Sequence, residues 1–163
     1  MRLAALLLLV FPAIYSQPHT LPAFPEFAVT ETFSGTPAAP VLRTAGQRKF
    51  RTMIRTGAAE GPNFAGHFTI ASWGCGSGCV SMAVIDAKDG RVYDAPFPAI
   101  SFLEYIEQAK MPPDKDIEPL QFHKDSRLLI VKGCPEEKDC AAYFYEWAPP
   151  KFKLIRKVPP FAE

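Results

Sequence analysis

An excess of charge of either sign is absent from this sequence. Its 163 residues include 18 Lys and Arg against 17 Asp and Glu, which leaves a net charge of +1. Proteins that bind nucleic acid present a broad basic surface to the phosphate backbone. Because the charges nearly cancel, we predict no nucleic-acid partner.

Long apolar runs are also scarce. The one unbroken run covers residues 3–11, after Arg2 and before Pro12, and no second run of this kind follows. A membrane-spanning helix needs roughly 20 such residues, so we expect no stable insertion into a membrane. A positive start, a short apolar stretch and a small residue at Ser16 are typical of a secretory signal peptide. We therefore predict a signal peptide at residues 1–16 and a periplasmic or secreted protein.

Complete catalytic and nucleotide-binding motifs are missing. Neither of the glycine-rich phosphate-binding patterns G-x-x-x-x-G-K-[ST] and G-x-G-x-x-G is present. Ser77 follows a glycine, but Cys75 stands where the nucleophile motif Gly-x-Ser-x-Gly has its first glycine. Paired catalytic carboxylates and histidine clusters are not evident either. The sequence therefore predicts no cofactor, no bound metal and no catalytic residue, and it favours a non-catalytic protein.

Proline, in contrast, is abundant. The chain has 17 prolines, which argue against a mainly helical fold. Residues 17–40 combine proline with phenylalanine, and disordered tails normally hold fewer aromatic residues. We expect an extended arm at residues 17–40 that lies on the rest of the protein. Residues 41–163 are then a single domain stapled by disulfides.

One helix signal follows the predicted arm. The pattern predicts a helix over residues 44–56, capped by Thr44 and ended by Gly57. Apolar residues with i, i+3, i+4 spacing predict its buried face, which comprises Phe50, Met53 and Ile54. Basic residues are expected on its outer face, namely Arg43, Arg48, Lys49, Arg51 and Arg55. A weaker helix signal covers residues 102–109.

From residue 63 onward the sequence is typical of β-strands. Strand-forming residues dominate five segments, at 64–73, 80–87, 127–132, 141–147 and 152–158, and residues 86–93 are typical of a hairpin that leads into a sixth strand. The Asp89-Gly90 pair favours a tight hairpin turn, and the proline-rich residues 95–119 are expected to be a connection. We predict an α+β fold dominated by β: an antiparallel meander of about six strands with one N-terminal helix packed on it.

Four cysteines lie in two closely spaced pairs. Cysteines of an exported protein are normally oxidised, and four of them permit three connectivities. We favour the local disulfides Cys75–Cys79 and Cys134–Cys140, because glycines on both sides of Ser77 let the chain fold back within the roughly 7 Å that a disulfide allows. Each loop this small stabilises by about 2 kcal/mol, so such bonds shape loops more than they hold the fold.

The loop at residues 74–79 is the candidate binding site. A disulfide makes this loop rigid, and an aromatic residue and a histidine precede it in the sequence. The candidate binding residues are His67, Trp73, Gly76, Ser77 and Gly78. We expect a non-catalytic binding module whose partner is an envelope or extracellular protein, a peptide or a glycan.

The alternative hypothesis is a small exported enzyme or a soft-metal site. Two thiolates and an imidazole suit copper or zinc, so His67 could bind metal together with Cys75 and Cys79. His123 could add a fourth ligand. In the enzymatic version, Ser77 acts as a nucleophile with His67 as base and Asp86 or Asp94 as third member.

Two short motifs resemble those of an uncharacterised family. The run F-A-G-H-F at residues 64–68, followed by W-G-C-G-x-x-C at residues 73–79, resembles a family of small exported bacterial proteins with no assigned activity. The resemblance covers residues 61–93, with shorter stretches at 125–129 and 143–147. It implies export from a bacterial cell and no particular substrate or cofactor.

Overall fold

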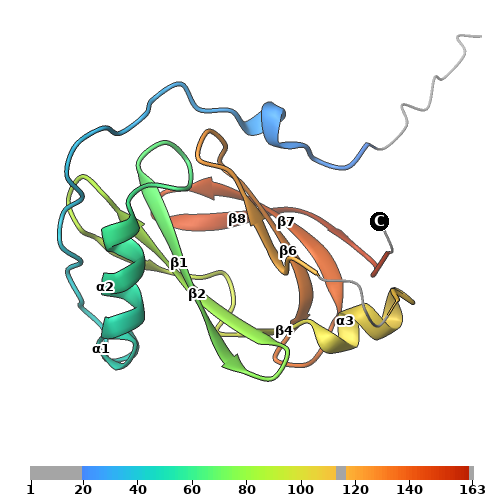
Figure 1. The fold of residues 1–163 in the computed structure, drawn as a ribbon. Helices are drawn as coiled ribbons and strands as arrows, with labels where there is room; N and C mark the ends of the chain where they lie inside the picture. The colour runs from blue at the N-terminus through green and yellow to red at the C-terminus, as the bar shows by residue number, and fades with distance from the viewer. Residues whose placement is uncertain (1–19, 113–116, 162–163) are drawn as a thin grey trace, which may run out of the picture.

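The protein folds around one antiparallel sheet (Figure 1). The computed structural model describes residues 20–112 and 117–161. The signal peptide predicted at residues 1–16 lies outside these residues. Eight strands form the sheet in the order β1-β2-β4-β6-β7-β8, with β3 paired to β2 and β5 paired to β6.

Short helices and strands of very different length make up the chain. The helices are η1 (Phe24–Phe27, a 3-10 turn), α1 (Ala45–Lys49), α2 (Arg51–Glu60) and α3 (Leu103–Gln108). The strands are β1 (Phe68–Gly76), β2 (Cys79–Asp86), β3 (Val92–Asp94), β4 (Ile100–Ser101), β5 (Leu120–Phe122), β6 (Leu128–Pro135), β7 (Ala141–Ala148) and β8 (Lys151–Val158). No helix in the described part of the chain is long and apolar enough to cross a bilayer.

The predicted class is confirmed, but the predicted strand count is too low. The fold is α+β and dominated by antiparallel strands, yet it has eight strands rather than about six. The two unpredicted strands are β4 and β5, which have only two and three residues. Strands this short show almost no periodicity in the sequence. The strand β4 also pairs with residues that are distant in the chain, so the pattern predicted a connection instead.

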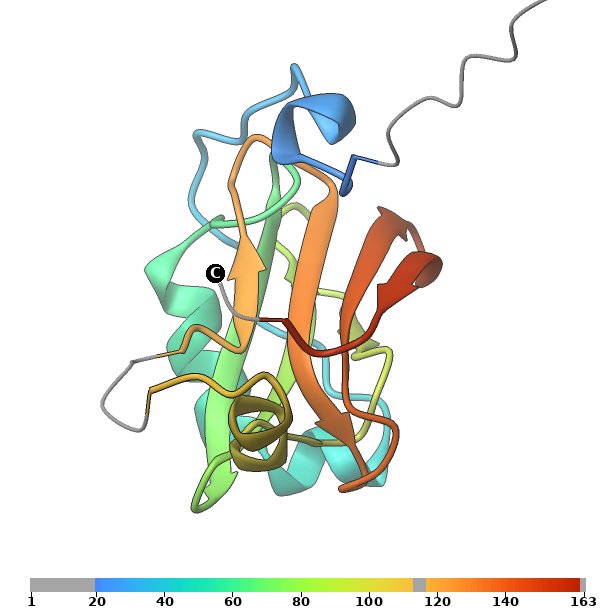
Figure 2. The same cartoon turned by 90° about the vertical axis from the view of Figure 1, so that its right-hand side faces the viewer.

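The strand β4 joins the two halves of the sheet. It pairs with the start of β2 on one side and with the end of β6 on the other. One apolar core contains side chains of β1 and β2 together with side chains of β6 and β7, including Phe68, Met82, Val84, Leu129, Tyr145 and Trp147. The sheet therefore bends at β4, so that the inner faces of its two halves pack against each other (Figure 2).

Helices cover the two outer faces of the bent sheet (Figure 1). Ile54 and Ala58 of α2 pack on β1 and β2, in a cluster that includes Ala71 and Ile85. Tyr105 of α3 packs on the other half, in a cluster completed by Leu128, Ile130, Cys134, Ala142 and Phe144. Each half of the sheet is thus buried on both faces over part of its length.

The predicted N-terminal helix is present but differs in detail. Thr44 caps it as predicted, since its hydroxyl accepts a hydrogen bond from the Gln47 N–H at 3.1 Å. The helix is divided at Phe50 into α1 and α2 and continues to Glu60. Met53 was expected on the buried face but is 49% exposed. Ile54 faces the sheet as predicted, and Ala58 rather than Met53 is buried beside it.

Gly57 does not end the helix, contrary to the prediction. It lies within α2, where a Cβ atom at this position would come within 2.4 Å of the Ala71 Cβ. The glycine therefore allows the helix to lie directly on β1. The helix ends at Gly61, whose φ of 87° is readily adopted only by glycine.

Residues 20–41 run along the outside of the body, across its top and down one side (Figure 1). Backbone hydrogen bonds attach them at several points: Val29 N–H donates to Asp125 O at 2.8 Å and Phe33 N–H donates to Gly66 O at 3.1 Å. The ring of Phe24 stacks on His123 with 3.8 Å between centroids. This segment is therefore held by specific contacts with the loops that precede β1 and β6.

Candidate functional site

The end of the β1–β2 hairpin extends beyond the apolar core. Residues 68–71 of β1 are buried, whereas Ser72 and residues 74–77 are exposed. A disulfide joins Cys75 to Cys79 at this end, with 5.2 Å between the Cα atoms, as predicted. The candidate loop is therefore an exposed and covalently closed hairpin end.

The loop is docked on one side and open on the other. The Gly78 carbonyl accepts a hydrogen bond from Phe102 N–H at 2.8 Å, and a Cβ atom at Gly78 would come within 2.2 Å of the Leu103 side chain. At Gly76, in contrast, an added Cβ would meet nothing within 4 Å. Ser77 is exposed. The loop thus rests on the start of α3 and presents Gly76 and Ser77 outward.

A groove lies beside this loop, on the face of the hairpin that carries the helices. We call it the helix-side groove. It has a volume of about 660 Å³ and lies between α1 and α2, the outer face of β1 and β2, and residues 94–99. Its apolar wall includes Phe50, Ile54, Trp73, Ala83 and residues 95–99, and Cys75 lies at its edge. Pockets for small ligands typically have volumes of about 300–1,000 Å³ and mostly apolar walls.

Trp73 forms the aromatic part of the groove wall. Side chains alternate along a strand, so Trp73 points to the same face as Ala71 and Cys75, which is the face covered by α2. Its indole stacks on the Phe50 ring with 5.0 Å between centroids. Trp73 was a predicted binding residue. Phe50 was predicted only as a core residue of the helix.

The polar edge of the groove centres on Gln47, which is 6% exposed. Its amide nitrogen donates to the Val92 carbonyl at 3.2 Å and to the Asp94 carboxylate at 3.4 Å, while its oxygen accepts from the Arg43 N–H at 2.7 Å. These bonds connect α1 to β3. Gln47 was not predicted as a site residue, although the Thr44-x-x-Gln47 capping box was visible in the sequence.

His67 lies far from the loop with which it was grouped. The pairing of Phe68 with Asp86 and of Gly76 with Cys79 puts His67 at the opposite end of the hairpin. Cys75 lies eight positions after His67 along an extended strand, which corresponds to a span of roughly 26 Å. The alternative that joins His67 to Cys75, Cys79 or Ser77 in a metal or hydrolytic site is therefore wrong in its geometry.

The surroundings of His67 are those of a partly buried structural residue. Its Nε2 atom lies 3.8 Å from the Asp86 carboxylate and its Nδ1 atom lies 4.0 Å from the Glu31 carboxylate. Lys88 forms an ion pair with the same Glu31. His67 thus helps to attach residues 20–41 to the body. Within residues 20–112 and 117–161, no three His, Cys, Asp or Glu side chains gather in a way that could hold a metal ion.

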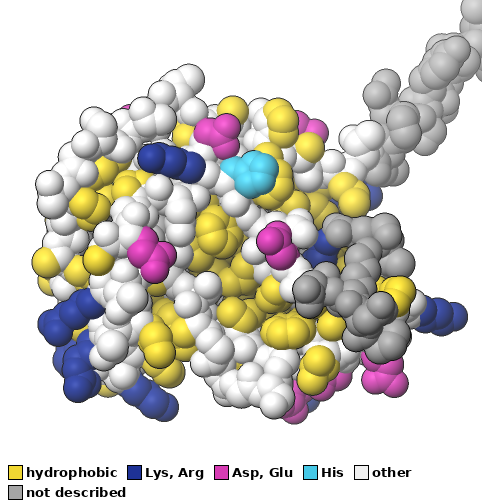
Figure 3. All heavy atoms as spheres, in the orientation of Figure 1, with side chains coloured by type: hydrophobic (Ala, Val, Ile, Leu, Met, Phe, Trp, Pro, Cys, Tyr) yellow, Lys and Arg dark blue, Asp and Glu magenta, His cyan; other side chains and the backbone are white. Residues whose placement is uncertain are grey.

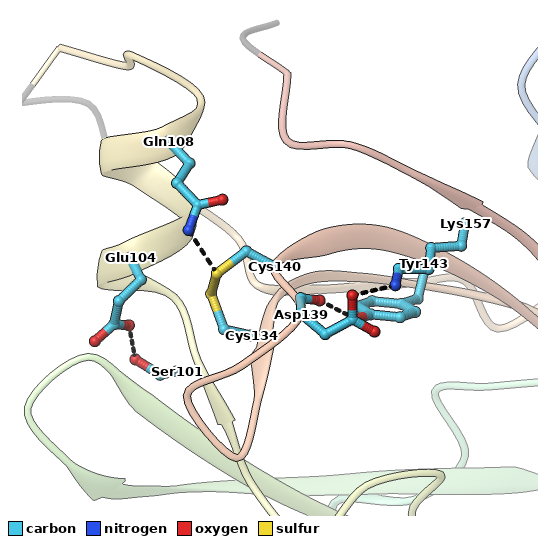
Figure 4. Close-up of a disulfide and its surroundings, with 8 residues drawn as sticks. All are labelled: Ser101, Glu104, Gln108, Cys134, Asp139, Cys140, Tyr143 and Lys157. Atoms are coloured by element: carbon cyan, nitrogen blue, oxygen red, sulfur yellow. Dashed lines mark hydrogen bonds and ion pairs between the residues drawn. A yellow bond between two sulfur atoms is a disulfide. The ribbon is translucent and has the colours of Figure 1, made fainter.

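The second disulfide lies in a very different place (Figure 4). It joins Cys134 to Cys140, with 4.0 Å between the Cα atoms, and this pairing was also predicted. Cys134 is completely buried, and the Gln108 amide of α3 lies 3.1 Å from the Cys140 sulfur. Two disulfides in one chain fit an oxidising, extracellular-type environment.

A second hollow lies on the other face of the hairpin. It has a volume of about 460 Å³ and is lined by Ser72, Val80 and residues 117–123. It is smaller than the helix-side groove. Its lining includes Glu118, Gln121 and His123, so it is also more polar. The helix-side groove is the better match to a site for an apolar ligand.

Comparisons of this chain with models of known protein families, with curated proteins and with solved structures gave no match. The resemblance to small exported bacterial proteins stays a prediction. The function is therefore inferred from the geometry described above.

Proposed function

We propose that the protein is an exported, non-catalytic binding module that holds a small, largely apolar ligand in the helix-side groove. The observation that carries this proposal is the groove itself, with its volume of about 660 Å³ and its wall of Phe50, Trp73 and Ala83. Burial of apolar ligand surface against such a wall is favourable by about 25 cal/mol per Å². The wall thus supplies affinity without any reacting group.

Rigid surroundings support the same proposal. The Cys75–Cys79 disulfide lies at the edge of the groove, and the buried Gln47 amide, which also lines it, fixes α1 to β3. A wall that is already ordered loses little conformational entropy when a ligand binds. The concave shape also favours a small molecule over the protein, peptide or glycan partner that the exposed loop alone suggested.

Fluorescence of the neutral apolar probe N-phenyl-1-naphthylamine tests the proposal. We expect the probe to bind with increased emission, and Trp73→Ala to weaken binding at least about 10-fold, because an aromatic side chain contributes several kcal/mol of contact. Ala99→Phe, which fills the groove from residue 99, should weaken binding without removing a wall residue.

The matched control is Leu154→Ala. Leu154 is 48% exposed on β8, in the other half of the sheet. The control should bind the probe as the original protein does. Equal affinity of the Trp73→Ala and Ala99→Phe variants and the original protein, or no probe binding at all, would contradict the proposal.

A further inference from the structure

We infer that the ligand of the helix-side groove is an anionic amphiphile, with an apolar chain in the groove and a carboxylate-type head group at the rim formed by α1. This inference rests on the proposed function and specifies the ligand class. It is carried by the charge beside the groove and by how that charge is held.

The residues around α1 are strongly and uniformly basic. Residues 41–59 contain five cationic side chains and no Asp or Glu. The five are Arg43, Arg48, Lys49, Arg51 and Arg55, and all of them are exposed. Figure 3 shows Lys and Arg side chains gathered at the lower left, beside α1 and α2. Within the described residues, none of the five has a carboxylate partner among the ion pairs.

Four of these cations are direct chain neighbours of groove residues, and we call them the rim cations. Arg43 precedes Thr44, Arg48 follows Gln47, and Lys49 and Arg51 flank Phe50. The Lys49 ammonium lies 5.4 Å from the centroid of the Phe50 ring, which forms part of the wall. Basic charge thus lies directly beside apolar surface, as the head group and chain of an anionic amphiphile require.

The side chain of Arg48 is held on the N-terminal side of α1. One of its guanidinium nitrogens donates to the Arg43 carbonyl at 2.8 Å, and a guanidinium nitrogen of Arg51 donates to the Arg48 carbonyl at 3.4 Å. Carbonyl groups leave the positive charge uncompensated. Guanidinium groups bind carboxylates through paired hydrogen bonds, so this rim is suited to a carboxylate.

The groove contributes one carboxylate of its own. Asp94 lines the groove and accepts a hydrogen bond from the Gln47 amide at 3.4 Å, so it lies on the α1 side, as the cations do. The four rim cations therefore outnumber this single carboxylate, and the net charge beside the groove is positive. A neutral ligand of the same length would gain the apolar contact and not the attraction to the rim.

Displacement of N-phenyl-1-naphthylamine by decanoate and by 1-decanol tests this inference, since the two share a chain and differ in the head group. At low ionic strength we expect decanoate to displace the probe at a concentration at least about 5-fold lower than 1-decanol does. The difference should shrink near 1 M salt, where the Debye length is about 3 Å. Shortening the chain should weaken both competitors by about 4-fold per CH₂ group.

Charge removal identifies the residues responsible. The double variant Arg48→Gln/Lys49→Gln should bind the neutral probe normally and lose most of the preference for decanoate. The matched control, Lys151→Gln/Lys153→Gln, removes the same charge from exposed positions on β8 and should keep the preference.

The outcomes separate the inference from the proposed function. If the probe binds and the two competitors displace it equally, the inference is overturned while the proposed function stands. The inference is also overturned if both double variants lose the preference to the same extent. If neither the probe nor either competitor binds, the proposed function itself fails.

Discussion

The β1–β2 and β6–β7 hairpins both end in a disulfide, and they differ in what surrounds the two sulfur atoms. The disulfides close loops of similar size, with sequence separations of 4 and 6 residues. Cys75 is exposed at the edge of the helix-side groove. Cys134 is completely buried beneath α3, in the cluster that contains Tyr105 and Ala142. The same bond thus lies at the exposed edge of a groove in one hairpin and within a core in the other.

The β6–β7 loop is also held by polar contacts that the β1–β2 loop lacks. The Tyr143 hydroxyl donates to the Asp139 carbonyl, and Lys157 of β8 forms an ion pair with the Asp139 carboxylate (Figure 4). The β1–β2 loop is attached through Gly78 and Cys79 but leaves Gly76 and Ser77 open. A loop closed by a disulfide therefore indicates neither a structural nor a functional role until its surroundings are known.

The largest effect is expected when the buried disulfide is removed. Cys134→Ala/Cys140→Ala should lower the free energy of unfolding by about 3 kcal/mol or more, because the loss of loop closure is added to a loss of packed volume under α3. Urea unfolding of the variant and the original protein measures this difference. If this variant loses no more free energy of unfolding than the variant without the exposed disulfide, burial of Cys134 adds nothing to the stabilisation by its disulfide.

A smaller loss of stability is expected for the exposed disulfide. Cys75→Ala/Cys79→Ala should lower the free energy of unfolding by about 2 kcal/mol, the loop-closure contribution alone. The same variant should bind N-phenyl-1-naphthylamine more weakly, because one edge of the groove is then no longer ordered. If binding stays the same and stability falls, the exposed disulfide has only a structural role.

Local features of the fold could be predicted from the sequence. The Thr44 helix cap and the Cys75–Cys79 disulfide were both predicted correctly. Each prediction needed only residues that are close in the sequence: the Thr44 side chain at the start of a helical pattern, and the glycines around Ser77 that allow a tight loop. Gly57 was misinterpreted because its role depends on Ala71, which lies on another element. A glycine that ends a helix and a glycine that lets a helix touch a strand look the same in the sequence.

The candidate site was predicted only in part, for a similar reason. Trp73 was identified, but the groove that it lines also needs α1 and residues 94–99, which come from separate parts of the chain. The grouping of His67 with the cysteine loop was an avoidable error. A strand was predicted between them, and an extended strand rises about 3.3 Å per residue, which already separates His67 from Cys75.

The smallest expected effect is a change in stability at alkaline pH. It arises from Tyr143 and Asp139 in the β6–β7 hairpin. Burial, reinforced by the nearby Asp139 carboxylate, raises the pKa of Tyr143 from 10.0 to about 12. The folded protein therefore disfavours the phenolate more than the unfolded chain does. The resulting stabilisation is complete below pH 10 and is lost as the pH rises through 10 toward 12.

Tyr143→Phe should therefore make unfolding less sensitive to pH in this range, measured as the change in urea midpoint between neutral and alkaline solution. The Cys75→Ala/Cys79→Ala variant is the matched control and should keep the original pH dependence, because it leaves the β6–β7 hairpin intact. The Cys134→Ala/Cys140→Ala variant should lose part of it, since Asp139 is then no longer held beside the Tyr143 hydroxyl. An equal response of all three variants would mean that alkaline pH acts elsewhere, and that the second hairpin differs from the first by packing alone.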